Sequence, residues 1–144
     1  MKTRFSSLVS LKKNTMQKSE RVVQNANKLL QNAKEALGES LVQLQDIPSP
    51  NHGVISEFLA IRTLFDSQRS IISHNEEWVA YAEQELFKAQ EQLKRDMIEY
   101  EKFKYLELQE IEKLIKAQKI KEAKDLDEVA LMTFTKKTTF QRVS

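Results

Sequence analysis

Apolar residues recur every seven positions along two long stretches of the chain. The first series is Val9, Met16, Val23, Leu30, Leu37 and Leu44, and the second is Phe58, Phe65, Ile72, Val79, Leu86, Leu93 and Tyr100. We call these the a positions of a heptad. The d positions, four residues before each a position in the first stretch and three after it in the second, are mostly small or polar. A strict seven-residue repeat indicates helices that supercoil around a partner helix, because a straight helix drifts away from such a repeat.

One short segment separates the two stretches. Pro48, Pro50 and Gly53 lie within six positions, and the chain has only one other glycine, Gly38. The residue before a proline is pushed out of helical geometry, so the first helix is expected to end near Ile47. The sequence predicts an all-α fold, a long antiparallel two-helix coiled-coil hairpin that forms one domain. Its expected parts are helix one at about 4–47, a turn at 48–55, helix two at about 56–131 and a frayed tail at 132–144.

The register of the two helices follows from what the turn allows. If Ile47 faces Phe58, small residues lie opposite large ones in successive layers, such as Ala33 opposite Ile72. Alternating large and small residues let two helices interdigitate. In this register Lys12 and Asp96 fall in adjacent layers and can pair. A register shifted by one heptad fits nearly as well.

Helix two is expected to extend past helix one. The next a and d positions after Phe103 are Glu107 and Glu110, which end the apolar seam. A new stripe follows, consisting of Leu108, Ile111, Leu114 and Ile115. A single helix cannot bury such a stripe, and exposed apolar stripes usually mark partner surfaces. Self-association and a frayed tail are the alternatives.

Composition excludes several classes of protein. Cysteine is absent, and neither His52 nor His74 has a histidine partner four residues away, so no metal site is predicted. No phosphate-binding glycine loop or nucleophile motif is present, and we predict no catalytic residue, no cofactor and no enzymatic activity. No apolar run approaches the length that spans a bilayer, so no direct membrane insertion is expected.

Charge is uneven along the chain although the net charge is only +2. Residues 1–47 carry +4, residues 48–98 carry −3 and residues 99–144 carry +1. Residues 1–21 hold six Lys and Arg against one acidic residue. Specific DNA binders usually have a stronger and more one-sided basic field, and acidic protein partners explain this basic patch equally well, so we expect no nucleic-acid partner.

The C-terminal segment resembles a known family. It contains Glu122-Ala123-Lys124-Asp125-Leu126-Asp127-Glu128-Val129-Ala130, followed by Phe134 and Lys136-Lys137. This is similar to the C-terminal signature of the FliJ family of flagellar export proteins, in which an acidic motif precedes an aromatic residue and basic residues. The opening Phe5-x-x-Leu8 and the turn glycine, Gly53, resemble the same family.

The resemblance implies a function in flagellar type III protein export. Members of the family are cytoplasmic and associate with the inner face of the membrane through the export apparatus. They act as a central stalk that enters the hexameric export ATPase, contact the export gate membrane protein, and escort other export chaperones. The residues that this implies for ATPase contact are Arg4, Phe5, Leu8, Leu126, Asp127, Glu128, Ala130 and Phe134. Gate contact is implied for the body of the hairpin, with Leu41, Leu64 and Ile71 as candidates there.

Two other functions are compatible with the residues. A generic coiled-coil scaffold or adaptor, including the injectisome counterpart of the YscO group, would have the same helical pattern. Non-specific nucleic-acid binding through residues 1–21 is a third hypothesis, which strong salt dependence without sequence preference would indicate. The repeat pattern does not determine the oligomeric state or the partner.

Overall fold

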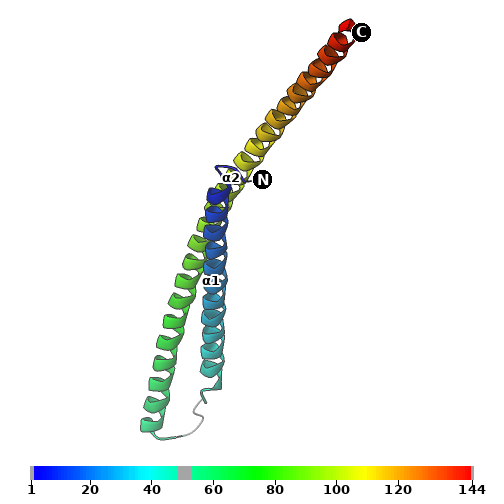
Figure 1. The fold of residues 1–144 in the computed structure, drawn as a ribbon. Helices are drawn as coiled ribbons and strands as arrows, with labels where there is room; N and C mark the ends of the chain where they lie inside the picture. Colours follow the sequence, from blue (N-terminus) through cyan, green and yellow to red (C-terminus); the bar gives the residue numbers. More distant parts are fainter. Residues whose placement is uncertain (1, 49–52, 144) are drawn as a thin grey trace. The chain divides into compact units, whose positions relative to one another are not determined.

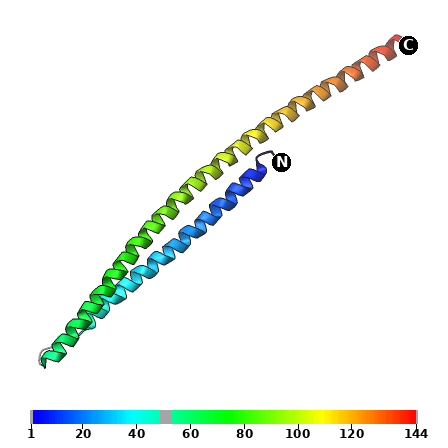
Figure 2. The same cartoon turned by 90° about the vertical axis from the view of Figure 1, so that its left-hand side faces the viewer.

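The computed structural model describes the backbone of residues 2–48 and 53–143 and the side chains of residues 2–48 and 53–137. It consists of two helices, α1 (Ser6–Asp46) and α2 (Ile55–Val143). In Figures 1 and 2, α1 runs beside the first part of α2 in the opposite direction. No strand occurs within the described residues, and the expected all-α antiparallel hairpin is confirmed.

Local chemistry explains where the helices end and begin. Pro48 restrains Ile47, whose backbone N–H donates to the Leu44 carbonyl at 3.3 Å in a closing turn. The first turn of α2 forms when the Val54 carbonyl accepts from the N–H groups of Glu57 and Phe58. Glu57 is an acidic residue in that first turn, where it interacts favourably with the helix dipole. A Cβ at Gly53 would meet the end of the exposed and flexible Glu57 side chain, which can move aside. The predicted turn residues 49–52 lie outside the described residues.

The expected end of helix two differs from the structure. Helix α2 continues past residue 131 to Val143. Threonines such as Thr133 and Thr135 lower helix propensity by only tenths of a kcal/mol, whereas Gly or Pro, which stop helices, do not occur after Gly53. Fraying of residues 132–144 in solution stays a prediction.

The chain forms two units, each of which contains parts of both helices. One unit is Lys13–Ile98, and the other combines Met1–Lys12 with Glu99–Ser144. In the first unit the buried residues all occupy heptad positions of the seam: Ser19, Ala26, Ala33, Ser40, Ile72, Asn75, Ala82 and Ala89. Seven of these eight are d positions with short or polar side chains. The larger a residues, such as Leu30 and Leu86, are half-buried because two helices cannot enclose a long side chain.

Contacts between the helices show the alternative register, one heptad from the first expectation. Ser19 donates a short hydrogen bond to Asp96, although it was expected to face Leu86. Asn75 Nδ2 donates to the Ala36 carbonyl at 3.2 Å, and Gln68 Nε2 donates to the Ser40 carbonyl at 2.8 Å. Lys12 and Asp96 therefore do not pair, and Lys12 lies 3.7 Å from the Glu99 carboxylate instead. The shift lets each polar side chain in the seam find a partner.

The same shift changes the start of α2. Phe58 was expected to pack against Ile47, but it is largely exposed, as are Val54, Ile55 and Leu59. Because the helices pair one heptad further along α2, Phe65 rather than Phe58 is the first half-buried a residue of this helix. The pairing of Ile47 with Phe58 was wrong for this reason.

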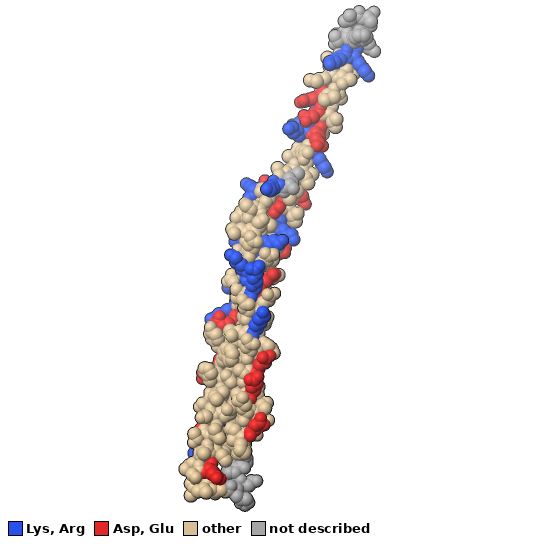
Figure 3. All heavy atoms as spheres, turned by 60° about the horizontal axis from the view of Figure 1, so that its bottom comes forward, with Lys and Arg blue, Asp and Glu red and all other residues tan. Residues whose placement is uncertain are grey.

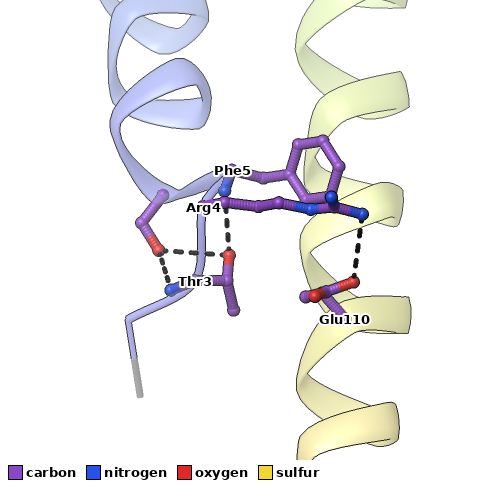
Figure 4. Close-up of polar contacts among 5 residues, drawn as sticks. Thr3, Arg4, Phe5 and Glu110 are labelled. Carbon is purple, nitrogen blue, oxygen red and sulfur yellow. Dashed lines mark hydrogen bonds and ion pairs between the residues drawn. The ribbon is translucent and has the colours of Figure 1, made fainter.

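In the second unit, the beginning of α1 is fixed by a reciprocal cap that the repeat pattern did not predict. Thr3 Oγ1 accepts from the Phe5 N–H at 3.1 Å, while Ser6 Oγ accepts from the Thr3 N–H at 2.8 Å (Figure 4). The Ser6 N–H donates to the Thr3 carbonyl at 3.1 Å. The arrangement is similar to a capping box, except that Ser6 replaces the usual glutamate and Thr3 Oγ1 accepts from the Phe5 N–H rather than from the Ser6 N–H. The cap directs Arg4 and Phe5 toward α2.

Overpacking at a small seam position tests the packing. Ala33 and Ala82 are fully buried, each with 0% of its surface exposed. The substitution Ala33→Leu should destabilise the hairpin by about 1–3 kcal/mol, because three extra carbon atoms must displace the facing helix. Thermal unfolding followed by circular dichroism measures this. The control Ala123→Leu, at an exposed position of α2, should leave the transition nearly unchanged. Equal transitions for both variants would contradict the seam.

The cap makes a separate, local prediction. Thr3→Val keeps the shape of the side chain and removes its hydroxyl, which should cost about 1 kcal/mol at the start of α1. Hydrogen exchange of the amides of residues 5–9 should accelerate, while amides in the middle of α1 keep their protection. Ser7→Ala, at an exposed position, is the control. If Ser7→Ala accelerates exchange as much as Thr3→Val does, the cap assignment is wrong.

Candidate protein-binding surfaces

The N-terminal segment packs against α2 within the second unit. Arg4 extends its guanidinium over the Phe5 ring, 4.9 Å from the ring centroid, and its Nη2 atom lies 3.7 Å from Glu110 Oε2 (Figure 4). Ser6 Oγ donates to Glu107 Oε1 at 3.5 Å. Because the Arg4 side chain is 73% exposed, this ion pair contributes only a few tenths of a kcal/mol and is easily exchanged for a partner's charge.

Pairing of the helices therefore continues further than the sequence predicted. Glu107 and Glu110 occupy the next a and d positions and were expected to end the seam after Phe103. Both are half-buried against the N-terminal segment, through Ser6 and Arg4 respectively. Lys12, beside Glu99 and 5.5 Å from the centroid of the Phe103 ring, gives the same unit a second polar layer. The pairing of the helices thus extends beyond the apolar a and d residues, because Glu107 and Glu110 have partners in the N-terminal segment.

Beyond Ile111, the described part of α2 contacts no other segment closely enough to bury its side chains. Every residue from Glu112 to Lys137 is exposed. Leu126 is 70% exposed and Phe134 is 69% exposed, and Val129, Leu131 and Met132 are similarly accessible. Large apolar side chains exposed at this density are the property of an interaction surface. We call residues 112–137 the unpaired segment, because the N-terminal part of α1 in this unit does not cover them.

The candidate ATPase-facing residues form two groups rather than one. Arg4 and Phe5 lie against the part of α2 around Glu110, and Leu8 follows them on α1 and is exposed. The other candidates, Leu126, Asp127, Glu128, Ala130 and Phe134, lie in the unpaired segment. Sixteen residues separate Glu110 from Leu126, which is about 24 Å along a helix. The family resemblance implies one ATPase-contact set for both groups, but the structure does not bring them together. The start of α1 lies against α2 near Glu107 and Glu110, and α2 continues well beyond that point, which explains the separation.

The predicted apolar stripe is present on α2. Leu108, Leu114 and Ile115 are exposed, while Ile111 is half-buried. At about 100° per residue, the four side chains lie within an arc of roughly 120°. A one-sided arc of this width fits a flat partner or a single partner helix.

The candidate gate-binding residues do not form one patch. Leu41, Leu64 and Ile71 are all exposed. Leu41 follows the buried d residue Ser40, whereas Leu64 and Ile71 precede a residues. An antiparallel pair brings these two kinds of flanking position to opposite edges of the seam. Leu64 and Ile71 therefore share one edge with half-buried Trp78, and Leu41 lies on the other.

Groups that could perform chemistry are dispersed along the helices. Among the described residues, no three His, Cys, Asp or Glu side chains come together as metal ligands would. His74 lies in an open hollow with Glu77, Trp78 and Tyr81, and His52 lies outside the described residues. Neither helix, over its described length, has a stretch apolar enough to cross a bilayer.

The sequence reasoning missed three features of these surfaces. It did not find the Thr3–Ser6 cap, although threonine is one of the residues preferred at a helix N-cap. It assigned no partner to Glu107 or Glu110. It also missed the exposed start of α2, where Val54, Ile55, Phe58 and Leu59 are accessible, because the first register covered Phe58.

Comparison with known proteins identifies the family. A search among curated proteins and a search among solved structures each gave no match. Residues 1–139 match the family model described as flagellar FliJ protein, which includes the capped N-terminal segment, the hairpin and the unpaired segment. Because this match covers nearly the whole chain, the protein belongs to the FliJ family and is a component of flagellar type III protein export.

Proposed function

We propose that this protein is the central stalk of the flagellar export apparatus, with no enzymatic activity of its own. It inserts into the hexameric export ATPase, links the ATPase to the export gate membrane protein, and escorts other export chaperones. It works in the cytoplasm, held at the inner face of the membrane by these partners. The family match supports the export role.

The observation that carries the stalk assignment is the unpaired segment. Residues 112–137 expose their whole circumference, and large apolar side chains such as Leu126 and Phe134 are among them. Burying one such side chain in a partner contributes about 1.5–3 kcal/mol, so several together give a substantial binding free energy. A helix that is open on all sides suits a partner that surrounds it.

The hairpin supplies the other property that a stalk needs. Two helices joined by a continuous seam resist bending more than one helix does, and the polar layers at Ser19, Asn75 and Gln68 fix their register. The edge that carries Leu64 and Ile71 remains accessible for the gate.

Truncation after Lys121 tests the stalk assignment. Among the described residues, the hydrogen bonds and ion pairs between the helices end at Glu110, so a chain of residues 1–121 should keep its hairpin and its helical circular dichroism. It should lose co-elution with the cognate hexameric ATPase and should no longer raise the ATPase rate. A chain that ends at Lys137 is the matched control and should retain both properties. An intact protein that leaves the ATPase rate unchanged would refute the stalk function.

Self-association through the stripe is the second candidate function, because Leu108, Leu114 and Ile115 are exposed on one arc. In that case the protein acts as a scaffold, either as a generic coiled-coil adaptor or as the counterpart in an injectisome. Sedimentation velocity distinguishes the two. The stalk assignment predicts a monomer at micromolar concentration, and a stable dimer that Leu114→Lys disrupts would favour the scaffold.

A further inference from the structure

The unpaired segment differs from an ordinary amphipathic helix in how its apolar residues are distributed. Relative to Leu108, the side chains of Ile120, Leu126, Val129 and Leu131 point to roughly 120°, 0°, 300° and 140° around the helix axis. All four are exposed. A partner that packs on one face, such as a single helix, would leave half of them in water. The distribution therefore favours a partner that encloses the segment.

Charge in the same segment is sorted into two consecutive bands. Residues 113–121 contain four lysines and no acidic residue, and we call them the basic band. Residues 122–128 contain four acidic residues and one lysine, and we call them the acidic band. Two further lysines follow at positions 136 and 137. Figure 3 shows this order as a group of red side chains between blue ones, next to the grey C-terminal residues.

Both bands extend around the helix, as the apolar residues do. Lys113, Lys116, Lys119 and Lys121 span an arc of roughly 200° at 100° per residue. The four carboxylates, Glu122, Asp125, Asp127 and Glu128, leave a largest gap of roughly 140°. If the charges bound a partner on one face of the helix, they would instead be confined to that face.

The two charged bands are far enough apart along the helix that a partner interacts with each one separately. Their centres are about eight residues apart, which is roughly 12 Å along the axis. This exceeds the Debye length of about 8 Å at physiological ionic strength. A partner that carried only one sign of charge would be attracted to one band and repelled by the other. Complementarity therefore requires a partner whose charges are ordered along the helix.

We propose that the unpaired segment binds inside a protein sleeve that carries two collars of opposite charge. An acidic collar contacts residues 113–121, a basic collar contacts residues 122–128, and apolar side chains of the sleeve cover Leu126 to Phe134. The order of the collars sets both the direction and the depth of insertion, because sliding by one band brings like charges together. This inference rests on the proposed function, in which the sleeve is the ATPase ring.

A band exchange tests the order of the charges. The variant K116E/K119E/D125K/E128K reverses two charges in each band and leaves the net charge and the apolar residues unchanged. Its affinity for the purified cognate ATPase hexamer should fall at least tenfold relative to the wild type in low salt. The matched control is K28E/K34E/E35K/E39K on α1, where all four residues are exposed and the net charge is also unchanged. The control should bind as the wild type does.

Variants with uncharged side chains provide a second test in case the band exchange lowers the helicity of the segment. K116Q/K119Q and D125N/E128Q remove charge from one band each and retain good or acceptable helix formers. Each should weaken binding several-fold and reduce its dependence on salt, while far-UV circular dichroism stays unchanged.

The outcomes separate this inference from the proposed function. If the wild type binds the hexamer and the band exchange binds equally well, the ordered collars are refuted and the stalk function stands. If the control weakens binding as much as the band exchange does, the bands are not the determinant and the inference is refuted. If the wild type does not bind the hexamer, the proposed function fails and the inference fails with it.

Discussion

The register of the two helices depends on the polar residues inside the seam. Apolar a positions repeat every seven residues, so apolar packing alone is nearly equal for registers that differ by one heptad. A buried polar group without a partner costs about 1–3 kcal/mol. The observed register gives Ser19 a carboxylate, and Asn75 and Gln68 a backbone carbonyl each. Satisfying these groups selects one of the two registers.

The register also determines where the pairing of the two helices ends. The capped N-terminal segment meets α2 near Glu107 and Glu110, and the helix beyond Ile111 has no covering element within the described residues. The a and d residues of the hairpin are mostly covered, whereas residues 112–137 expose side chains around the whole helix, including Leu126 and Val129.

The heptad repeat predicted the class of fold well because both series run without interruption from Val9 to Leu44 and from Phe58 to Tyr100. The single cluster of helix breakers predicted the turn. Register was harder to predict, since it depends on which polar side chains reach which carbonyls across the seam. The continuation through Glu107 and Glu110 was missed because two carboxylates at a and d positions indicate the end of a seam unless their partners, here Ser6 and Arg4, are known.

The candidate site was predicted in part. The sequence predicted that Leu126, Phe134 and most of the stripe are exposed, because the second helix is longer than the first and extends beyond it. The position of Arg4 and Phe5 near Glu110 was not predicted, because it depends on which of the two registers forms. The placement of Leu41 on the opposite edge from Leu64 and Ile71 does follow from the sequence, because a shift of one heptad leaves their heptad positions unchanged. Spacing along one helix cannot establish contacts between two helices when a shift of one heptad preserves the pattern.

Hydrogen exchange of the protein, alone and bound to the cognate ATPase hexamer, is the most direct test of the central claim that the unpaired segment is the main partner contact. We expect amides of residues 112–137 to exchange rapidly in the free protein and to become strongly protected in the complex. Amides in the seam of residues 13–98 should be protected equally in both states. Protection gained in residues 13–98, with none in residues 112–137, would contradict the account.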